Sequence, residues 1–147
     1  MTDLLRRRPA AALLSAGIVG LSLMTAYVHF SLGTTASLMG LLFLANAAGY
    51  VALATAFVIG AAVRVPVVSR FSWLPRVALA GFTGLTIAGY LAMGPYFTLG
   101  WITKGIELGI LALLLLDVIR VYGSPVALVR SAVASLRGRP DRAPATA

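Results

Sequence analysis

Four apolar segments, each long enough to cross a lipid bilayer, constrain this chain more than any other feature of its sequence. They cover about residues 10–30, 36–62, 76–94 and 97–121 of a 147-residue chain that is 60% hydrophobic and 11% charged. This composition is typical of membrane proteins. A span needs about 20 apolar residues, and its backbone polar groups must pair within the segment, as they do in an α-helix. The sequence therefore predicts an all-α fold, a four-helix transmembrane bundle over residues 1–122.

The twelve Lys and Arg residues lie at the chain ends and around one connection, apart from Lys104. Three arginines at residues 6–8 precede the first segment, three more lie within residues 64–76, and Arg120 and later arginines follow the fourth segment. Positively charged residues favour the cytoplasmic side of a membrane. We therefore expect an inner (plasma) membrane protein with both termini in the cytoplasm. Despite the net charge of +8, this distribution forms no basic patch for nucleic acid.

The first apolar segment is also arranged like a signal peptide, because basic residues precede an apolar run. The best cleavage position, after Ala26, has Met24 where a small residue is required. We therefore interpret this segment as an uncleaved membrane helix.

A short helix is expected over residues 124–138, after the fourth span. Ser124 suits an N-cap, and Pro125 suits the first helical position. The apolar residues of this segment share one face that is flanked by arginines, which is typical of a helix lying on an anionic inner leaflet. A solvated amphipathic helix would have the same pattern. Residues 139–147 are predicted to be disordered.

Small residues recur four apart in every predicted span. The rows are Ala12, Ala16 and Gly20; Ala48, Ala52, Ala56 and Gly60; Ala80, Gly84 and Ala88; and Gly105 and Gly109. In lipid, such rows let helix backbones approach closely and supply the packing. We therefore expect a compact bundle. Gly105 and Gly109 lie opposite Glu107 on the helix, so they offer a second face for a homodimer or a larger membrane complex.

The charged residues inside the fourth span are the strongest functional signal. Lys104 and Glu107 lie about 10 Å and 15 Å along the helix from its outer end. An ionised side chain in hydrocarbon normally faces the bundle interior, finds a partner and marks a functional site. Polar residues of the other spans fall at similar depth, in the outer half: His29, Asn46, Thr86 and Tyr90. We expect these six residues to form a ligand-binding or ion-binding cluster.

Two interpretations of this cluster stay open. Lys104 and Glu107 are one helical turn apart, so they can pair with each other and act as a neutral clamp that holds the helices in register. Alternatively, Glu107 exchanges a proton or binds a cation or a polar head group. Lys104 would then adjust the protonation of Glu107 or hold an anionic group.

Other chemistries are disfavoured by the residues present. The chain has no cysteine, and its single histidine has no second His or thiolate to complete a metal or haem site, so we expect no metal and no other cofactor. Phosphate-binding loops and the GxSxG and HExxH motifs are absent from the sequence, and we expect no enzymatic activity. Asp117 and Arg120, one turn apart near the inner end, are interpreted as an interfacial salt bridge.

Several short motifs lie within residues 26–117: "HFSLG" at 29–33, "NAAGY" at 46–50, the Gly-Pro pair at 94–95 and "TKGIE" at 103–107. In these motifs the chain resembles a group of small, uncharacterised bacterial and archaeal integral membrane proteins with four predicted spans. The resemblance implies the architecture and no particular activity.

The leading functional hypothesis is a small binding or accessory membrane protein. Its outer-half cluster would hold a lipid, a quinone-like ligand or a partner helix. The alternative is a proton- or ion-coupled small transporter or channel that uses Glu107. Replacing Glu107 by Gln separates the two, since it should abolish coupled flux while an accessory role survives.

Overall fold

The computed structural model describes residues 2–63, 65–94 and 96–137, with side chains from residue 9 onward. Every regular element in this part of the chain is a helix: α1 (Thr2–Leu32), α2 (Leu38–Ala62), α3 (Pro66–Arg70), α4 (Trp73–Met93), α5 (Thr98–Tyr122) and α6 (Pro125–Leu136). The predicted all-α class is confirmed. The short helix α3 was not predicted from the sequence, and the tail predicted at 139–147 lies outside the described residues.

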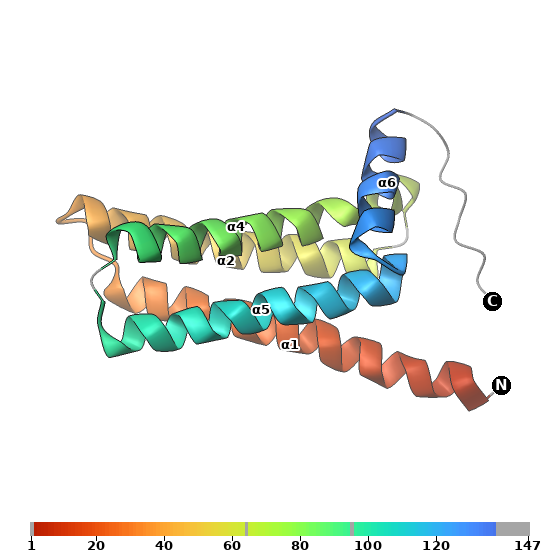
Figure 1. The fold of residues 1–147 in the computed structure, drawn as a ribbon, viewed down its shortest axis with the longest axis horizontal. Coiled ribbons are helices and arrows are strands. Elements are labelled where there is room, and N and C mark those ends of the chain that lie inside the picture. The colour runs from red at the N-terminus through yellow and green to blue at the C-terminus, as the bar shows by residue number, and fades with distance from the viewer. Residues whose placement is uncertain (1, 64, 95, 138–147) are drawn as a thin grey trace.

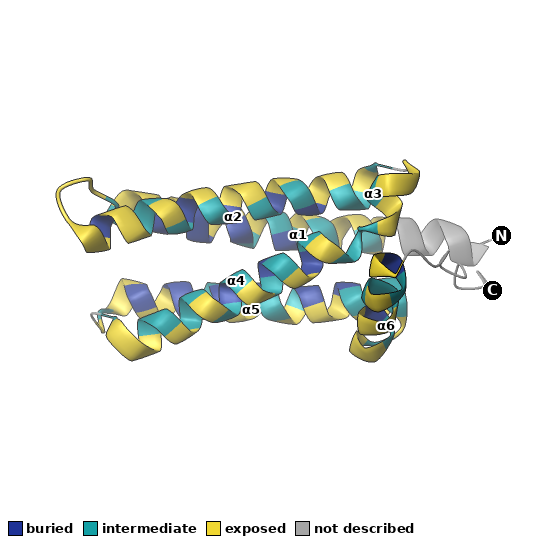
Figure 2. Ribbon diagram, turned by 90° about the horizontal axis from the view of Figure 1, so that it is seen from above, coloured by how far each residue is buried: buried dark blue, intermediate teal, exposed yellow. Residues whose placement is uncertain are grey.

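The four long helices run side by side, and α6 crosses them at one end (Figure 1). Both α1 and α4 contact α2 and α5, so the order around the assembly is α1, α2, α4, α5. Figure 2 shows the same arrangement from above, with α1 beside α2 and α4 beside α5. The N-terminal end of α1, α3 and α6 lie at one end of the molecule, here called the α6 end. The α1–α2 and α4–α5 connections lie at the opposite end, here called the loop end.

Local sequence signals fix several helix ends. Ser37 caps α2, where its hydroxyl accepts a hydrogen bond from the Gly40 N–H at 3.1 Å. Ser124 caps α6 in the same way by accepting from the Ala127 N–H, as the sequence predicted. Between α5 and α6, Gly123 has a φ of +82°, a conformation that L side chains rarely adopt. This glycine lets the chain turn sharply at the end of α5, so that α6 crosses the ends of the long helices (Figure 1).

Among the residues that the structure describes, three helices are long and apolar enough to cross a membrane: Pro9–Leu32, Leu38–Ala62 and Trp73–Met93. The outward surfaces of the long helices are largely apolar, and Leu13 and Leu85, for example, are 73% and 71% exposed. A continuous apolar surface of this kind suits lipid and would cause aggregation in water. These features support a helical membrane protein. Helix α5 is as long as α2, but it carries Lys104, Glu107, Asp117 and Arg120.

Large side chains fill most of the space between the helices, together with Ala26, Ala47 and Ala54, which lie outside the predicted rows of small residues. The core includes Ile18, Tyr50, Phe57, Leu79, Ile110 and Leu114. The prediction that the small-residue rows form the helix contacts is wrong for most of their members. On α2, Ala48 and Ala52 are exposed, whereas Tyr50 and Phe57 point into the core. A Cβ added at Gly20, Gly84 or Gly105 would meet nothing within 4 Å.

The tightest contacts between a glycine of one long helix and a side chain of another lie outside those rows, although Gly60 and Gly109 of the rows are also closely packed. A Cβ on Gly49 of α2 would lie 2.4 Å from the ring of Phe82 on α4. A Cβ on Gly100 of α5 would lie 2.4 Å from the hydroxyl of Tyr90. In both places an aromatic ring of α4 presses against the backbone of a neighbouring helix, and only the missing side chain leaves room for it.

Candidate functional site

Lys104 and Glu107 of α5 form a buried ion pair near the loop end. Lys104 is 5% exposed and Glu107 is fully buried. The Lys104 ammonium donates a hydrogen bond to Oε2 of Glu107, one turn along the same helix. The ammonium also lies 5.3 Å from the centroid of the Tyr90 ring, a cation–π contact. The two opposite charges therefore compensate each other within one helix.

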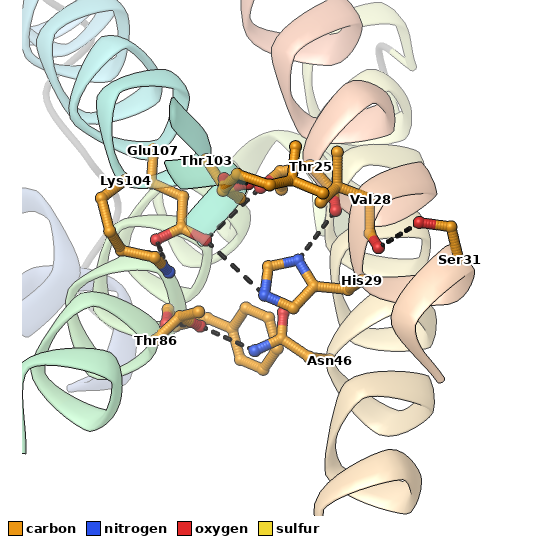
Figure 3. Close-up of polar contacts among 11 residues, drawn as sticks. Thr25, Val28, His29, Ser31, Asn46, Thr86, Thr103, Lys104 and Glu107 are labelled. Carbon is orange, nitrogen blue, oxygen red and sulfur yellow. Dashed lines mark hydrogen bonds and ion pairs between the residues drawn. The ribbon is translucent and has the colours of Figure 1, made fainter. Parts of the chain in front are cut away.

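Helix α1 brings two polar residues to the carboxylate of Glu107 (Figure 3). The Thr25 hydroxyl donates to Oε1 of Glu107 at 3.4 Å. Nδ1 of His29 lies 2.8 Å from the backbone carbonyl oxygen of Thr25. Because a carbonyl only accepts, Nδ1 carries the proton, and this bond fixes the orientation of the ring. Nε2 of His29 then lies 3.9 Å from Oε1 of Glu107.

Asn46 and Thr86 link α2 to α4 beside this pair. Nδ2 of Asn46 donates to Oγ1 of Thr86 at 3.1 Å, and that hydroxyl donates to the Phe82 carbonyl at 3.0 Å. Since Thr86 has used its single proton, it can only accept from Asn46, which fixes the orientation of the amide. This single hydrogen bond thus joins Asn46 and Thr86 across two helices.

Tyr90 of α4 covers the ion pair from the loop end. Its ring packs edge-on against Tyr96 and Trp101, with centroids 5.8 Å and 5.5 Å away. Its hydroxyl donates to the Phe97 carbonyl at 3.4 Å. These contacts hold the ring in place over the Lys104 ammonium.

A pocket of about 320 Å³ lies among the four long helices at this level. Its lining includes five of the six predicted site residues: His29, Asn46, Thr86, Tyr90 and Lys104. Most of the remaining lining is apolar. Leu42 of α2 and Leu85 and Met93 of α4 line the pocket and are 50%, 71% and 71% exposed. The pocket therefore opens to the surroundings between α2 and α4, and Glu107 lies buried beside Lys104 and His29.

Three buried polar atoms near this pocket have no hydrogen-bond partner within the described residues: Oδ1 of Asn46, the hydroxyl of Tyr50 and Oγ1 of Thr83. Tyr50 and Thr83 are fully buried. An unsatisfied buried polar group costs about 1–3 kcal/mol, so this part of the interior is not optimised for stability. The sequence prediction did not place Tyr50 or Thr83 in the site. Their spacing could have indicated them. Tyr50 lies four residues after Asn46 on one face of α2, and Thr83 lies three residues before Thr86 on one face of α4.

A second group of charges lies at the α6 end. Asp117 of α5 is fully buried and accepts from Nε of Arg76 at 2.8 Å and from Arg120 at 2.5 Å. The Arg76 guanidinium also lies 5.3 Å from the centroid of the Phe57 ring. The predicted salt bridge between Asp117 and Arg120 is confirmed, and Arg76 is a second partner that the sequence interpretation missed. The sequence placed Arg76 at the edge of the connection, but α4 begins earlier, at Trp73, so Arg76 points into the interior.

In the part of the chain that the structure describes, no group of three or more His, Cys, Asp or Glu side chains is placed to hold a metal ion. No protein-family model, no curated protein and no solved structure matches the chain. The resemblance of residues 26–117 to small four-span membrane proteins therefore stays a prediction. What the protein does has to follow from the geometry of this site.

Proposed function

We propose that the chain is a four-span membrane protein that binds an amphiphilic small molecule, a lipid or a quinone-like compound. The pocket that opens between α2 and α4 is the observation that carries this proposal. Its walls are apolar and its opening lies among exposed leucines, while His29, Asn46 and Lys104 lie along it. An apolar pocket with a few convergent polar groups is the usual form of a small-molecule site. An amphiphile would enter sideways from the lipid and place its polar head among these groups.

In this proposal α5 is the fourth span. It lies beside α1 and α4 along its length, and its buried charges are paired, Lys104 with Glu107 and Asp117 with two arginines. Paired charges that face the bundle interior are the form in which membrane spans tolerate ionised residues. The four long helices would then form a transmembrane bundle.

The α6 end faces the cytoplasm in this proposal, which places the protein in the inner (plasma) membrane. This end carries most of the described arginines: Arg70, Arg76, Arg120, Arg130 and Arg137. Positively charged residues are retained on the cytoplasmic side. Helix α6 crosses the ends of the long helices (Figure 1), and its exposed Val126, Val129 and Val133 would meet the head-group region of the inner leaflet.

The layer between the two charged groups favours binding over conduction. Glu107 and Asp117 are ten residues apart, about 15 Å along α5. The buried side chains between these levels are mostly apolar and at most 2% exposed: Ile18, Phe57, Leu79, Ile110 and Leu114. The hydroxyl of the buried Ser22 is used within α1, where it donates to the Ile18 carbonyl. A polar path from the pocket to the α6 end would have to cross this layer. A site reached from one side suits a binding or accessory protein.

Native mass spectrometry of the protein extracted gently from its membranes tests the proposal. Gly89 lines the pocket, and a Cβ there meets nothing within 4 Å, so Gly89→Leu fills the pocket without a backbone clash. Gly81 lies on the same helix, is exposed and also has free space around it. We expect the wild type and Gly81→Leu to retain a bound amphiphile and Gly89→Leu to lose it. Equal loading of all three proteins, or none in any, would contradict the proposal.

Proton-coupled transport is the second candidate, and one observation favours it. Nε2 of His29 lies 3.9 Å from Oε1 of Glu107, so a proton can pass between a pocket-lining imidazole and a buried carboxylate through a small movement. Flux driven by a pH gradient in liposomes tests this function. Coupled flux in the wild type that disappears in Glu107→Gln would establish transport, and the absence of flux from both proteins would reject it.

A further inference from the structure

We infer that the pocket selects an amphiphile with an uncharged, hydroxyl-bearing head group over one with an anionic phosphate. Diacylglycerols, isoprenoid alcohols and quinols belong to the selected class. The inference rests on the proposed function, because it names the class of ligand for the same pocket.

The charge balance of the pocket is the first argument. Lys104 is the one Lys or Arg among the lining residues that the structure describes, and Glu107 already compensates it. Moving a proton from the ammonium to the carboxylate leaves the total charge of the pair at zero. An anionic head group would therefore enter apolar surroundings with no free counter-charge, which is strongly unfavourable.

The cost of recruiting Lys104 is the second argument. A phosphate is the kind of ligand that a lysine ammonium binds well. If Lys104 turned to a phosphate, however, Glu107 would keep its charge in a fully buried position, with only the neutral hydroxyls of Thr25, at 3.4 Å, and Tyr50 near it. Removing one partner of a buried ion pair costs about 3–5 kcal/mol. The pair thus resists opening for an anion.

The free hydrogen-bonding capacity is the third argument. One N–H of the Asn46 amide donates to Thr86, while Oδ1 of Asn46 has no partner among the described residues and can accept; the Thr86 hydroxyl donates to a backbone carbonyl. His29 uses its Nδ1 proton on the Thr25 carbonyl, and Nε2, at 3.9 Å from Glu107, lies beyond hydrogen-bond distance of that carboxylate. In the neutral ring Nε2 is an acceptor. A hydroxyl can donate to this atom, whereas an ionised phosphate cannot.

Two probes with the same acyl chains test the inference: dioleoylglycerol, which is uncharged, and dioleoylphosphatidylglycerol, which is anionic. Each is titrated into delipidated protein at about pH 8, where an ordinary imidazole is neutral. Native mass spectrometry measures the binding of each probe, and the part of the binding that is lost in Gly89→Leu is assigned to the pocket. We expect the wild type and Gly81→Leu to bind dioleoylglycerol at least about ten-fold more tightly than they bind dioleoylphosphatidylglycerol. Equal or tighter binding of the anionic probe would overturn the inference.

Charge variants sharpen this test. Glu107→Gln leaves the Lys104 ammonium uncompensated, so binding of the anionic probe should rise by about ten-fold or more. The double variant Lys104→Met with Glu107→Gln removes both charges and should return the preference to dioleoylglycerol. An unchanged preference in Glu107→Gln would contradict the charge argument. If Glu107→Gln does not fold, the wild-type comparison still decides the inference.

The outcomes also separate this inference from the proposed function. If neither probe binds the wild type in a way that Gly89→Leu abolishes, the pocket does not bind such amphiphiles and both proposals fail. If both probes bind there and the anionic one binds as tightly, the pocket binds amphiphiles and only the head-group inference fails.

Discussion

The two buried charged groups of this molecule lie on the same helix and are built differently. Lys104 and Glu107 are both on α5 and pair within one turn, beside a pocket. Asp117 pairs with Arg76 of α4 as well as with Arg120 of α5. The Lys104–Glu107 ion pair lies within one helix, whereas the Arg76–Asp117 ion pair joins α4 to α5. This difference indicates that the Asp117 group stabilises the bundle and that the Lys104–Glu107 pair belongs to a binding site.

The surroundings of the two groups support the same distinction. Both oxygens of Asp117 accept hydrogen bonds from arginines at 2.8 Å or less. Near Glu107, by contrast, the Tyr50 hydroxyl and Thr83 Oγ1 have no hydrogen-bond partner among the described residues. Fully satisfied polar networks stabilise a fold, whereas an unsatisfied buried polar group costs free energy, and a functional role is one reason for a protein to keep it.

The largest effect is expected from Asp117→Ala. It leaves Arg76, which is 4% exposed, without a counter-charge, and should lower the free energy of unfolding by about 3–5 kcal/mol. Denaturation of the purified protein in detergent measures this. Arg120→Ala is the control, since the Arg120 side chain is 43% exposed and its loss should cost no more than about 1 kcal/mol. Equal effects of the two variants would contradict the structural role of Asp117.

Gly49→Leu tests whether packing rather than charge holds α2 against α4 near the pocket. The new side chain would begin 2.4 Å from the Phe82 ring, and the overpacking should cost about 1–3 kcal/mol. The same denaturation experiment measures the loss. Gly81→Leu, with free space around it, should be as stable as the wild type. A Gly49→Leu protein with wild-type stability would show that this contact adjusts freely.

Glu107→Gln should destabilise the fold less than Asp117→Ala, by about 1–2 kcal/mol. The glutamine can still accept a hydrogen bond from Lys104, and the lysine stem allows the ammonium to extend toward the loop end. A loss of stability as large as that of Asp117→Ala would make the Lys104–Glu107 pair structural and would remove the contrast between the two groups. Comparison with the double variant Lys104→Met, Glu107→Gln measures how much of the loss belongs to the pair.

The smallest effect is expected from Ser135→Ala at the contact between α6 and the start of α4. The Trp73 indole donates to the Ser135 hydroxyl at 2.9 Å, and Arg70 donates to the Ser135 backbone carbonyl, which the variant keeps. The loss should be about 1 kcal/mol and local. Hydrogen exchange should become faster in α6 and stay unchanged in α5. Faster exchange throughout the long helices would show that α6 stabilises the whole bundle.

The sequence predicted the long helices well because each is a run of apolar residues bounded by polar or turn-forming ones. Ser37 and Ser124 act as helix caps through their own hydroxyls, which is a local effect. Five of the six predicted site residues line one pocket, because depth along a helix follows directly from residue count. The partnership of Arg76 with Asp117 was missed because it depends on where α4 begins and on how α4 is rotated.

By itself, the sequence determined that the chain forms long apolar helices and at which levels its charges lie. Only the tertiary structure decided which face of each helix points inward. Helix α2 is apolar on nearly every side, so its periodicity gives little direction. The expected row of Ala48 and Ala52 is exposed, while Tyr50 and Phe57 are buried. In lipid, burying one apolar face gains little over burying another. The rotation of each helix therefore depends on how side chains of different helices fit together, as where Phe82 packs on Gly49 and Arg76 reaches Asp117.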